Sequence, residues 1–215
     1  MSKRRSRILW ALAGMIIVIG IAAAAAGPIM SRVEQPKYQV TASNGPIELR
    51  SYDSMIAAEA TVEGRRKEAI NEGFALIAAY IFGANKPNTE IKMTTPVQQQ
   101  RQQKIAMTAP VTQQSDGDSW VVRFIMPERW KMQTLPVPED DRVNLVPIPA
   151  QRMVVIRFSG TANDALIRAK IAELRNYVET QNLAVVGEPV YAFYDPPWTL
   201  PFFRRNEIMF QIVGT

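Results

Sequence analysis

The sequence predicts an α+β protein: a distorted antiparallel β-barrel of two related halves, flanked by two α-helices and preceded by one N-terminal transmembrane helix. Three observations lead to this prediction. The first is an uncharged apolar run near the N-terminus, and the second is a series of short strand-like segments joined mainly by short turns. The third is a strand–helix pattern that occurs twice. We divide the 215 residues into an anchor (1–30), a linker (31–37) and a domain (38–215).

The apolar run extends from Ile8 to Met30 and contains no charged residue. It is long enough to span a bilayer as a helix. Basic residues at positions 3, 4, 5 and 7 precede it, so the positive-inside rule places the N-terminus in the cytoplasm and the domain on the periplasmic, extracytoplasmic side of the inner membrane. Ala24–Ala26 resemble a signal cleavage site, but the run is longer than a usual signal core, which favours an uncleaved anchor.

Strand-like segments account for most of the domain. The first two, "YQVTAS" and "PIELRSY", flank an Asn44-Gly45 turn. The others are "MIAAEATVEG", "SWVVRFIMP", "MVVIRFSG", "PVYAFY" and "NEIMFQIV". In "SWVVRFIMP" one face alternates through Trp120, Val122, Phe124 and Met126, the period of a half-buried strand. The Pro-rich, acidic stretch "PERWKMQTLPVPEDDRV" reads as a surface loop.

Two segments have helical periodicity. The first spans about 65–82, and the second spans about 163–180, with Asn163 or Asp164 available as its N-cap. Gly83 supplies a stop for the first. Their apolar stripes are Ile70, Phe74, Ile77 and Ile81 in the first, and Ile167, Ile171, Leu174 and Val178 in the second.

The same spacing relates the two halves of the domain. Met55 and Met153 begin similar strands 98 residues apart, and Ile70 and Ile167 occupy matching helical positions 97 residues apart. Strand and helix therefore recur at nearly one offset, which predicts two strand–strand–helix–strand–strand halves.

A shorter repeat follows the first predicted helix. Residues 91–97 (IKMTTPV) are echoed by residues 105–111 (IAMTAPV), with a Gln-rich hinge between them. We expect each copy to be structural: Met and Val pack inward beneath the first helix, and Thr closes a hydrogen bond at the edge. Pro96 and Pro110 then end a strand or sit at an edge. Met93→Ala should then lower stability more than it changes any ligand spectrum.

Composition excludes several function classes. There is no Cys and no His, which removes disulfides, thiol catalysis, Ser-His-Asp chemistry and most transition-metal sites. Much of the net charge of +5 belongs to the N-terminal segment, so a nucleic-acid footprint on the domain is not expected. The sequence shows no arrangement of a nucleophile with a base, no closely spaced carboxylate pair and no phosphate-binding loop. We therefore do not expect an enzyme.

Three longer phrases carry a family resemblance. They are "YIFGANKPNTEIKMTTPV", "VVRFIMPERWKMQTLPVPEDDRV" and "YAFYDPPWTLPFFRRNEIMF". In order and spacing they resemble the SOUL haem-binding protein family over about residues 38–213, in the form of a bacterial, membrane-anchored member. The resemblance implies a distorted antiparallel barrel of two halves with two helices. It also implies reversible, non-catalytic binding of haem or a related tetrapyrrole in an apolar groove.

In the family that groove lies between the first helix and the loop after the Tyr-Asp-Pro-Pro motif. Aromatic side chains suit a flat porphyrin, and arginines suit its propionates. The residues expected to contact the ligand are therefore Phe74, Ile77, Ala78, Ile81, Phe82, Trp198, Leu200, Phe202, Phe203, Arg204 and Arg205. From the residues alone the alternative stays open that the aromatics cap the barrel and the two arginines are a solvated pair.

Iron ligation is the point at which this chain departs from some family members, which are credited with an axial His. Haem here must be held by Met, Tyr or Lys, or by apolar contact and propionate pairing alone. Met93, Met107 and Tyr80 are candidates, although a Met in such a phrase is more often core filler. No iron ligand can be assigned from the sequence, and an iron-free tetrapyrrole is an alternative.

Two other functions stay open. The two-half architecture resembles the effector-binding domains of some bacterial regulators, which accept other small apolar ligands. A groove rich in acidic residues would favour that reading, whereas Asp195 and Glu207 near the expected groove are fewer than its adjacent arginines, which favours an anionic ligand. Alternatively "WTLPFF" is an exposed patch that docks on a protein or lipid of the envelope.

Overall fold

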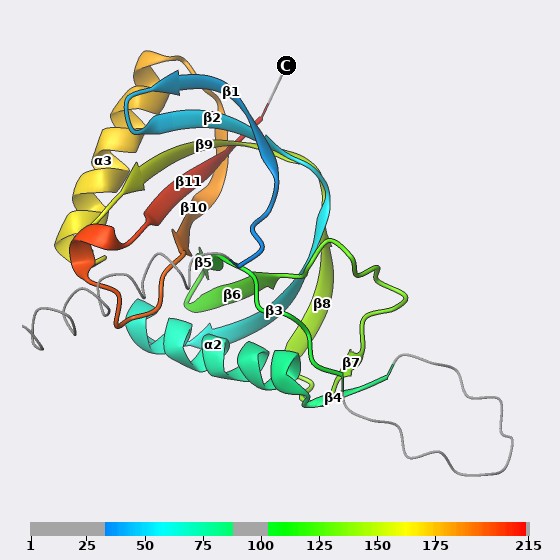
Figure 1. The fold of residues 1–215 in the computed structure, drawn as a ribbon. Helices are drawn as coiled ribbons and strands as arrows, with labels where there is room; N and C mark the ends of the chain where they lie inside the picture. The colour runs from blue at the N-terminus through cyan, green and yellow to red at the C-terminus, as the bar shows by residue number, and fades with distance from the viewer. Residues whose placement is uncertain (1–32, 88–102, 214–215) are drawn as a thin grey trace, which may run out of the picture.

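A computed structural model describes residues 33–87 and 103–213 as one large antiparallel sheet with two helices on it (Figure 1). The nine-stranded sheet has the order β1-β2-β9-β11-β10-β5-β6-β3-β8. Its strands are β1 (Tyr38–Asn44), β2 (Ile47–Tyr52), β3 (Met55–Glu63), β5 (Val111–Asp116), β6 (Ser119–Ile125), β8 (Val143–Ile148), β9 (Gln151–Phe158), β10 (Val185–Phe193) and β11 (Asn206–Ile212). The helices are α2 (Arg66–Phe82) and α3 (Asp164–Thr180). A small ladder joins β4 (Asn85–Lys86) to β7 (Val137–Pro138).

The sheet has the two-half symmetry that the sequence repeat predicts. One half consists of β2, β3, α2, β5 and β6, and the other of β8, β9, α3, β10 and β11. If each element is exchanged for its counterpart, the order from β2 to β8 reads the same in reverse. The outer strands are swapped, because β2 pairs with β9 of the other half and β8 pairs with β3. The strands β10 and β5 join the halves at the centre.

Both helices cover the same face of the sheet. The helix α2 packs on β3 and β6, and α3 packs on β9. Strand residues alternate between the two faces. Val154 and Ile156 therefore lie in the core under α3, whereas Met153 and Val155 belong to a separate cluster on the other face. The sheet curls away from the helices, so that the helix-free face is concave (Figure 1).

Among residues 33–87 and 103–213 the predicted distorted barrel does not close into a full ring of strands. The strands β1 and β8 are the edges of an open sheet. The physical reason lies in β1, where every residue after Tyr38 is exposed, so that this strand has no inward face with which to close a barrel. The segment before β1 instead contacts the loop after β6, through the ion pair between Lys37 and Glu128.

The helix α2 matches its predicted bounds to within one residue, but it presents a different face to the sheet. Its buried residues are Ala69, Gly73, Ile77, Tyr80 and Ile81, whereas Ile70 is half-buried and Phe74 is exposed. Gly73 explains the rotation. A Cβ at this position would lie 2.6 Å from Cβ of Val122, so the helix backbone rests directly on β6. Close packing thus overrides the apolar stripe that the sequence shows.

The helix ends follow the sequence signals. Asn163 caps α3, because its side-chain oxygen accepts a hydrogen bond from Leu166 N at 2.9 Å. Gly83 follows α2 with φ of 126°, a conformation open to glycine but not to most residues. The predicted stripe of α3 is confirmed: Ile167, Leu174 and Val178 are buried, and Ile171 packs against their cluster.

The doubled Met-Thr-x-Pro-Val phrase can be followed in its second copy only, because residues 91–97 lie outside the described ranges. In the second copy Ile105 packs beneath α2, and its backbone N–H donates to Ile81 O at 2.9 Å. Met107 is exposed, which corrects the expectation that the Met packs inward. Thr108 closes the predicted hydrogen bond, to the carbonyl of Ile125, and Pro110 directly precedes β5 instead of ending a strand.

Across residues 33–87 and 103–213, none of the helices combines the length and the apolar character that a membrane span requires. The predicted span, residues 8–30, lies outside these ranges.

Candidate functional site

The predicted contact residues on α2 divide into buried and exposed sets. Ile77 and Ile81 are fully buried in the core between α2 and the sheet. Ala78 is half-buried, whereas Phe74 and Phe82 are exposed. Any ligand on the outer surface of α2 would therefore meet the two phenylalanines and not the two isoleucines.

The predicted loop residues form the most exposed apolar surface of the described protein. In this aromatic loop (residues 195–205), the exposed fractions are 68% for Trp198, 43% for Leu200, 65% for Phe202 and 47% for Phe203. The single-turn 3₁₀ helix η1 (Pro201–Phe203) holds the rings of Phe202 and Phe203 with their centroids 4.5 Å apart. The loop thus presents its aromatic side chains outward.

The aromatic loop lies beside the N-terminal ends of the helices. Gly160 N donates to Pro201 O at 2.8 Å, which fixes η1 to the turn before α3. Arg66, the first residue of α2, donates to the carboxylate of Asp164, the first residue of α3, at 2.9 Å. Phe82 is at the other end of α2, about 24 Å along the helix from Arg66 at 1.5 Å per residue. The structure therefore does not bring Phe82 together with the loop aromatics.

The two loop arginines are engaged within the protein. Arg204 Nε donates to Thr199 O at 2.7 Å, and its Nη2 donates to Pro197 O at 2.5 Å. Arg205 donates to one carboxylate oxygen of Glu207 from Nε at 2.9 Å and from Nη2 at 2.8 Å. They stiffen the loop and its junction with β11, which neither the propionate-binding reading nor the solvated-pair reading anticipated.

Arg205 belongs to a buried polar network on the helix-free face. Its centre is Glu207, which also accepts from Arg50 Nη1 at 2.9 Å and from the Tyr194 hydroxyl at 2.7 Å. Burial raises the pKa of the Glu207 carboxyl, but the hydrogen bond and charge of Arg50, with Arg205 and Tyr194, lower it overall. Burial raises the pKa of Tyr52, which accepts from Arg50, to about 12. The network is fully paired and holds β2 to β11 across β9.

A cluster of basic side chains surrounds Asp164, where the two helix N-termini meet. The guanidinium of Arg66 lowers the pKa of the Asp164 carboxyl by hydrogen bond and charge, and Arg168 and Lys67 contribute further. Arg66 bonds this carboxylate directly and the other two cations act on it through charge, next to the turn that is hydrogen-bonded to η1. Sequence reasoning missed this cluster, because its members come from two helices that start 98 residues apart.

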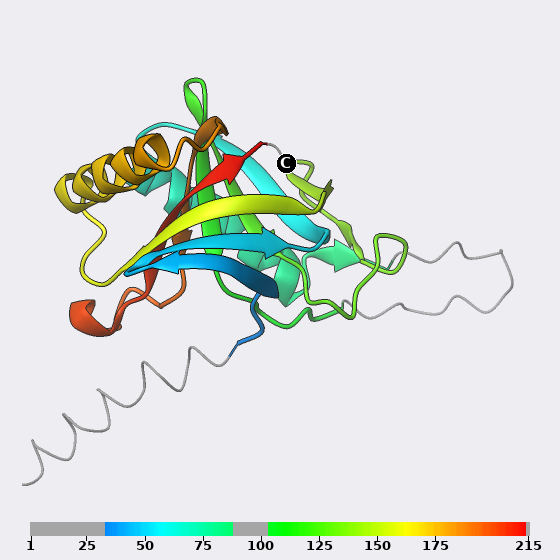
Figure 2. The same ribbon diagram turned by 90° about the horizontal axis from the view of Figure 1, so that it is seen from above.

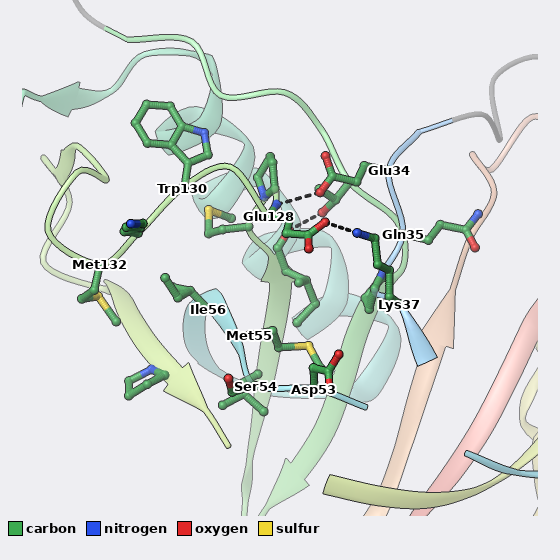
Figure 3. Close-up of a pocket in the computed structure, with 18 of the residues that line it drawn as sticks. Glu34, Gln35, Lys37, Asp53, Ser54, Met55, Ile56, Glu128, Trp130 and Met132 are labelled. Carbon is green, nitrogen blue, oxygen red and sulfur yellow. Dashed lines mark hydrogen bonds and ion pairs between the residues drawn. The ribbon is translucent and has the colours of Figure 1, made fainter. Parts of the chain in front are cut away.

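Elsewhere among the described residues, two cavities are notable for their size. The first has a volume of about 580 Å³ and is lined by Met55, Ile56, Trp130 and Met132 among others (Figure 3). Across its rim Lys37 pairs with Glu128 at 2.5 Å. The indole N–H of Trp130 is buried without a hydrogen-bond partner in the described part of the chain.

The second cavity, of about 470 Å³, lies between the two halves of the domain. Met55 and Met153, the pair that revealed the repeat, both line it. Its charged groups are Glu59 and Arg123, which pair at 2.5 Å across β3 and β6. None of the predicted contact residues lines either cavity. The repeated methionine was the one sequence signal that could have pointed here.

Neither of the two candidate iron ligands in the described ranges lies beside the aromatic loop. Tyr80 is buried, and its hydroxyl donates to Pro136 O at 2.9 Å. Met107 is exposed on the opposite end of α2 from the aromatic loop, next to residue 105, and Met93 lies outside the described ranges. Exposed rings and nearby cations are thus present among the described residues, as a tetrapyrrole would require, and Tyr80 and Met107 lie away from them.

Comparison with known proteins decides the family. A model of the family described as SOUL heme-binding protein matches residues 33–211. The chain belongs to the SOUL heme-binding protein family. Heme-binding protein 1 of Sus scrofa is 30% identical over 158 residues, which are 69% of this chain and 76% of that protein. Heme-binding protein 1 of Bos taurus is 28% identical over 155 residues, which are 69% of this chain and 75% of that protein.

Solved structures agree on the fold alone. The C-terminal domain of EcmrR aligns with a TM-score of 0.57 at 15% identity, covering 83% of this chain and 99% of that domain. A hydrolase from Listeria innocua aligns with a TM-score of 0.50 at 15% identity, covering 80% of this SOUL-family chain and 94% of its own. At these identities the likeness carries no information on ligand or activity.

Proposed function

We propose that this protein binds haem or a related tetrapyrrole reversibly and without catalysis. Membership of the SOUL heme-binding protein family is the observation that carries the proposal. We further propose that residues 8–30 tether it to the inner membrane, with the N-terminus in the cytoplasm and the domain outside. The uncharged composition of that run and the basic residues before it support the tether.

The surface best suited to a porphyrin is the aromatic loop together with the helix N-termini beside it. Trp198, Phe202 and Phe203 offer large planar side chains on a loop that internal hydrogen bonds already hold in shape. A prearranged surface loses little conformational freedom on binding. The exposed Phe74 on α2 is a further candidate contact.

The propionates would pair with the basic cluster at the helix N-termini. Lys67 and Arg168 are exposed there, and both lie near enough to Asp164 to lower the pKa of its carboxyl. Helix N-termini favour anions, which adds to the attraction. This assigns to Lys67 and Arg168 the role first expected of Arg204 and Arg205, whose donors are used within the loop.

Iron contributes little to affinity in this account, because the sequence has neither His nor Cys. We therefore expect ferric haem and iron-free protoporphyrin to bind with similar affinity. Added imidazole should shift the Soret band of bound ferric haem, because the sequence has no His to ligate the iron.

A titration of the full chain in detergent micelles tests the proposal. Ferric haem, iron-free protoporphyrin and an apolar cation are added in parallel, and the Soret band and tryptophan fluorescence are followed. We expect saturable one-to-one binding of both porphyrins. Trp198→Ala should weaken it severalfold, and Lys67→Gln should weaken it less. Met132→Ala, in the first cavity, is the control and should bind as the parent does. Absence of saturable porphyrin binding would refute the proposed function.

A second candidate function has its own structural support. The cavity between the halves, with three methionines, two tyrosines and the Glu59–Arg123 pair in its lining, suits another small apolar ligand. In the same titration this function predicts saturation by the apolar cation and not by the porphyrins, with Met153→Ala lowering the affinity. Binding only to lipid or detergent would favour an interaction module instead.

A further inference from the structure

The outward direction of the aromatic loop suggests a partner beyond the tetrapyrrole. Trp198, Leu200, Phe202 and Phe203 fall within six residues and are all exposed. Monomeric soluble proteins seldom expose so contiguous an apolar surface without a use for it. We propose that this loop inserts into the headgroup layer of the bilayer that residues 8–30 span. The inference rests on the tether in the proposed function.

Hydrogen bonds and prolines within the loop keep these apolar side chains exposed to solvent. Phe203 N donates to Leu200 O at 2.9 Å, and Arg204 bonds two loop carbonyls. Pro196, Pro197 and Pro201 restrict the backbone further. Side chains that would otherwise fold back on the domain are thereby kept exposed, as a membrane-inserting loop requires.

The loop also lies on the side where the chain enters the domain. Figure 2 shows the start of the described chain and η1 on the same side of the sheet, at the bottom of that view. Arg205 Nη1 donates to Gln35 Oε1 at 3.1 Å, which ties the end of the loop to the segment before β1. Residues 31–33 span at most about 11 Å at roughly 3.5 Å per residue. A tethered domain must therefore keep this side close to the bilayer.

The composition of the loop suits the interface between lipid and water. Residues 196–205 contain no Asp or Glu. Trp is enriched at the headgroup level of membranes, because its ring is apolar while its N–H forms hydrogen bonds. Phe and Leu beside it add apolar area that is buried on insertion. The basic cluster at the helix N-termini would face the headgroups, and haem, an apolar disc, would reach the loop from the lipid.

Site-directed spin labelling of the full chain in lipid nanodiscs tests this orientation. The sequence has no Cys, so single substitutions give unique labelling sites. Phe203→Cys reports on the loop. Val137→Cys, on β7 and away from the loop, is the matched control, since both residues are 47% exposed. We expect collisions with oxygen, relative to a water-soluble nickel complex, to be severalfold more frequent at position 203 than at position 137. Phe202→Cys provides a second loop position.

Three results would overturn the inference. Equal, water-like accessibility at both positions in nanodisc-bound protein would refute docking, while the tether and the detergent titration would still stand. A loop label shielded from both relaxants would mean that protein, and not lipid, covers the loop. Loss of the chain from the nanodiscs in an alkaline wash would remove the tether itself, without bearing on porphyrin binding in micelles.

Discussion

At the scale of single residues, Glu207 is the group whose environment is most demanding. It is almost completely buried and accepts hydrogen bonds from Arg50, Arg205 and Tyr194. A buried charge is tolerated only when it is paired, and the removal of one partner leaves the others uncompensated. The network therefore makes the stability of the concave face depend on one carboxylate.

Glu207→Gln should lower the free energy of unfolding by about 3–5 kcal/mol, the range seen when one partner of a buried ion pair is removed. Urea denaturation monitored by circular dichroism measures the change. Glu68→Gln is the control, because its ion pair with Arg65 is exposed, and we expect no measurable change there. If the two variants lose equally little, the buried network does not hold the sheet together.

At the scale of elements, Gly73 sets the distance between α2 and the sheet. Gly73→Ala would add a Cβ 2.6 Å from the Cβ of Val122 in β6. Alanine favours the helix by up to about 1 kcal/mol, but overpacking of a tight core costs about 1–3 kcal/mol. We expect net destabilisation, measured as a lower melting temperature. Gly73→Ala should cost less stability in a Val122→Gly background, where the contacting Cβ is absent. A more stable single variant would contradict the close contact.

The ends of the helices were largely predictable from the sequence, whereas the face that α2 buries against the sheet was not. Caps and stops such as Asn163 and Gly83 act within one turn, so they fixed the helix ends. The buried face of α2 depends on contact with β6, which hydrophobic periodicity does not register. The edge strand β8 was not predicted, because it follows a Pro-rich stretch and itself contains Pro147.

At the scale of the whole molecule, buried titratable groups should limit stability at both extremes of pH. The pKa of Glu207 is below its ordinary value of 4.5, so the unfolded state binds the proton first and its stabilisation is lost as pH falls below about 4.5. The pKa of Tyr52 is raised from 10 to about 12, so its stabilisation is present below pH 10 and is lost as pH rises towards 12.

Urea midpoints between pH 3 and pH 11 check these two limits. The difference between the parent protein and Glu207→Gln should shrink in acid, because the parent then loses the same charge. Tyr52→Phe should flatten the decline above pH 10. A parent curve without decline at either extreme would contradict the pairing and burial of these groups.

The arrangement of the candidate site was beyond sequence reasoning for a topological reason. Arg50 and Glu207 are 157 residues apart and meet only because β2, β9 and β11 are neighbours in the sheet. Lys67 and Arg168 likewise act on one carboxylate because the bond between Arg66 and Asp164 joins the two helix N-termini. The sequence repeat predicted the two halves, but it did not predict that an outer strand of each half pairs with the other half.

The aromatic loop is the surface at which we propose that a tetrapyrrole binds. Paramagnetic broadening in an NMR titration of the labelled full chain with ferric haem, with zinc protoporphyrin as the diamagnetic reference, tests it most directly. We predict that the amide signals of residues 198–200, 202 and 203, and of the helix starts at Lys67 and Arg168, broaden in proportion to the haem bound. Broadening confined to Met55, Arg123 and Met209 would place the ligand in the cavity between the halves and contradict the account.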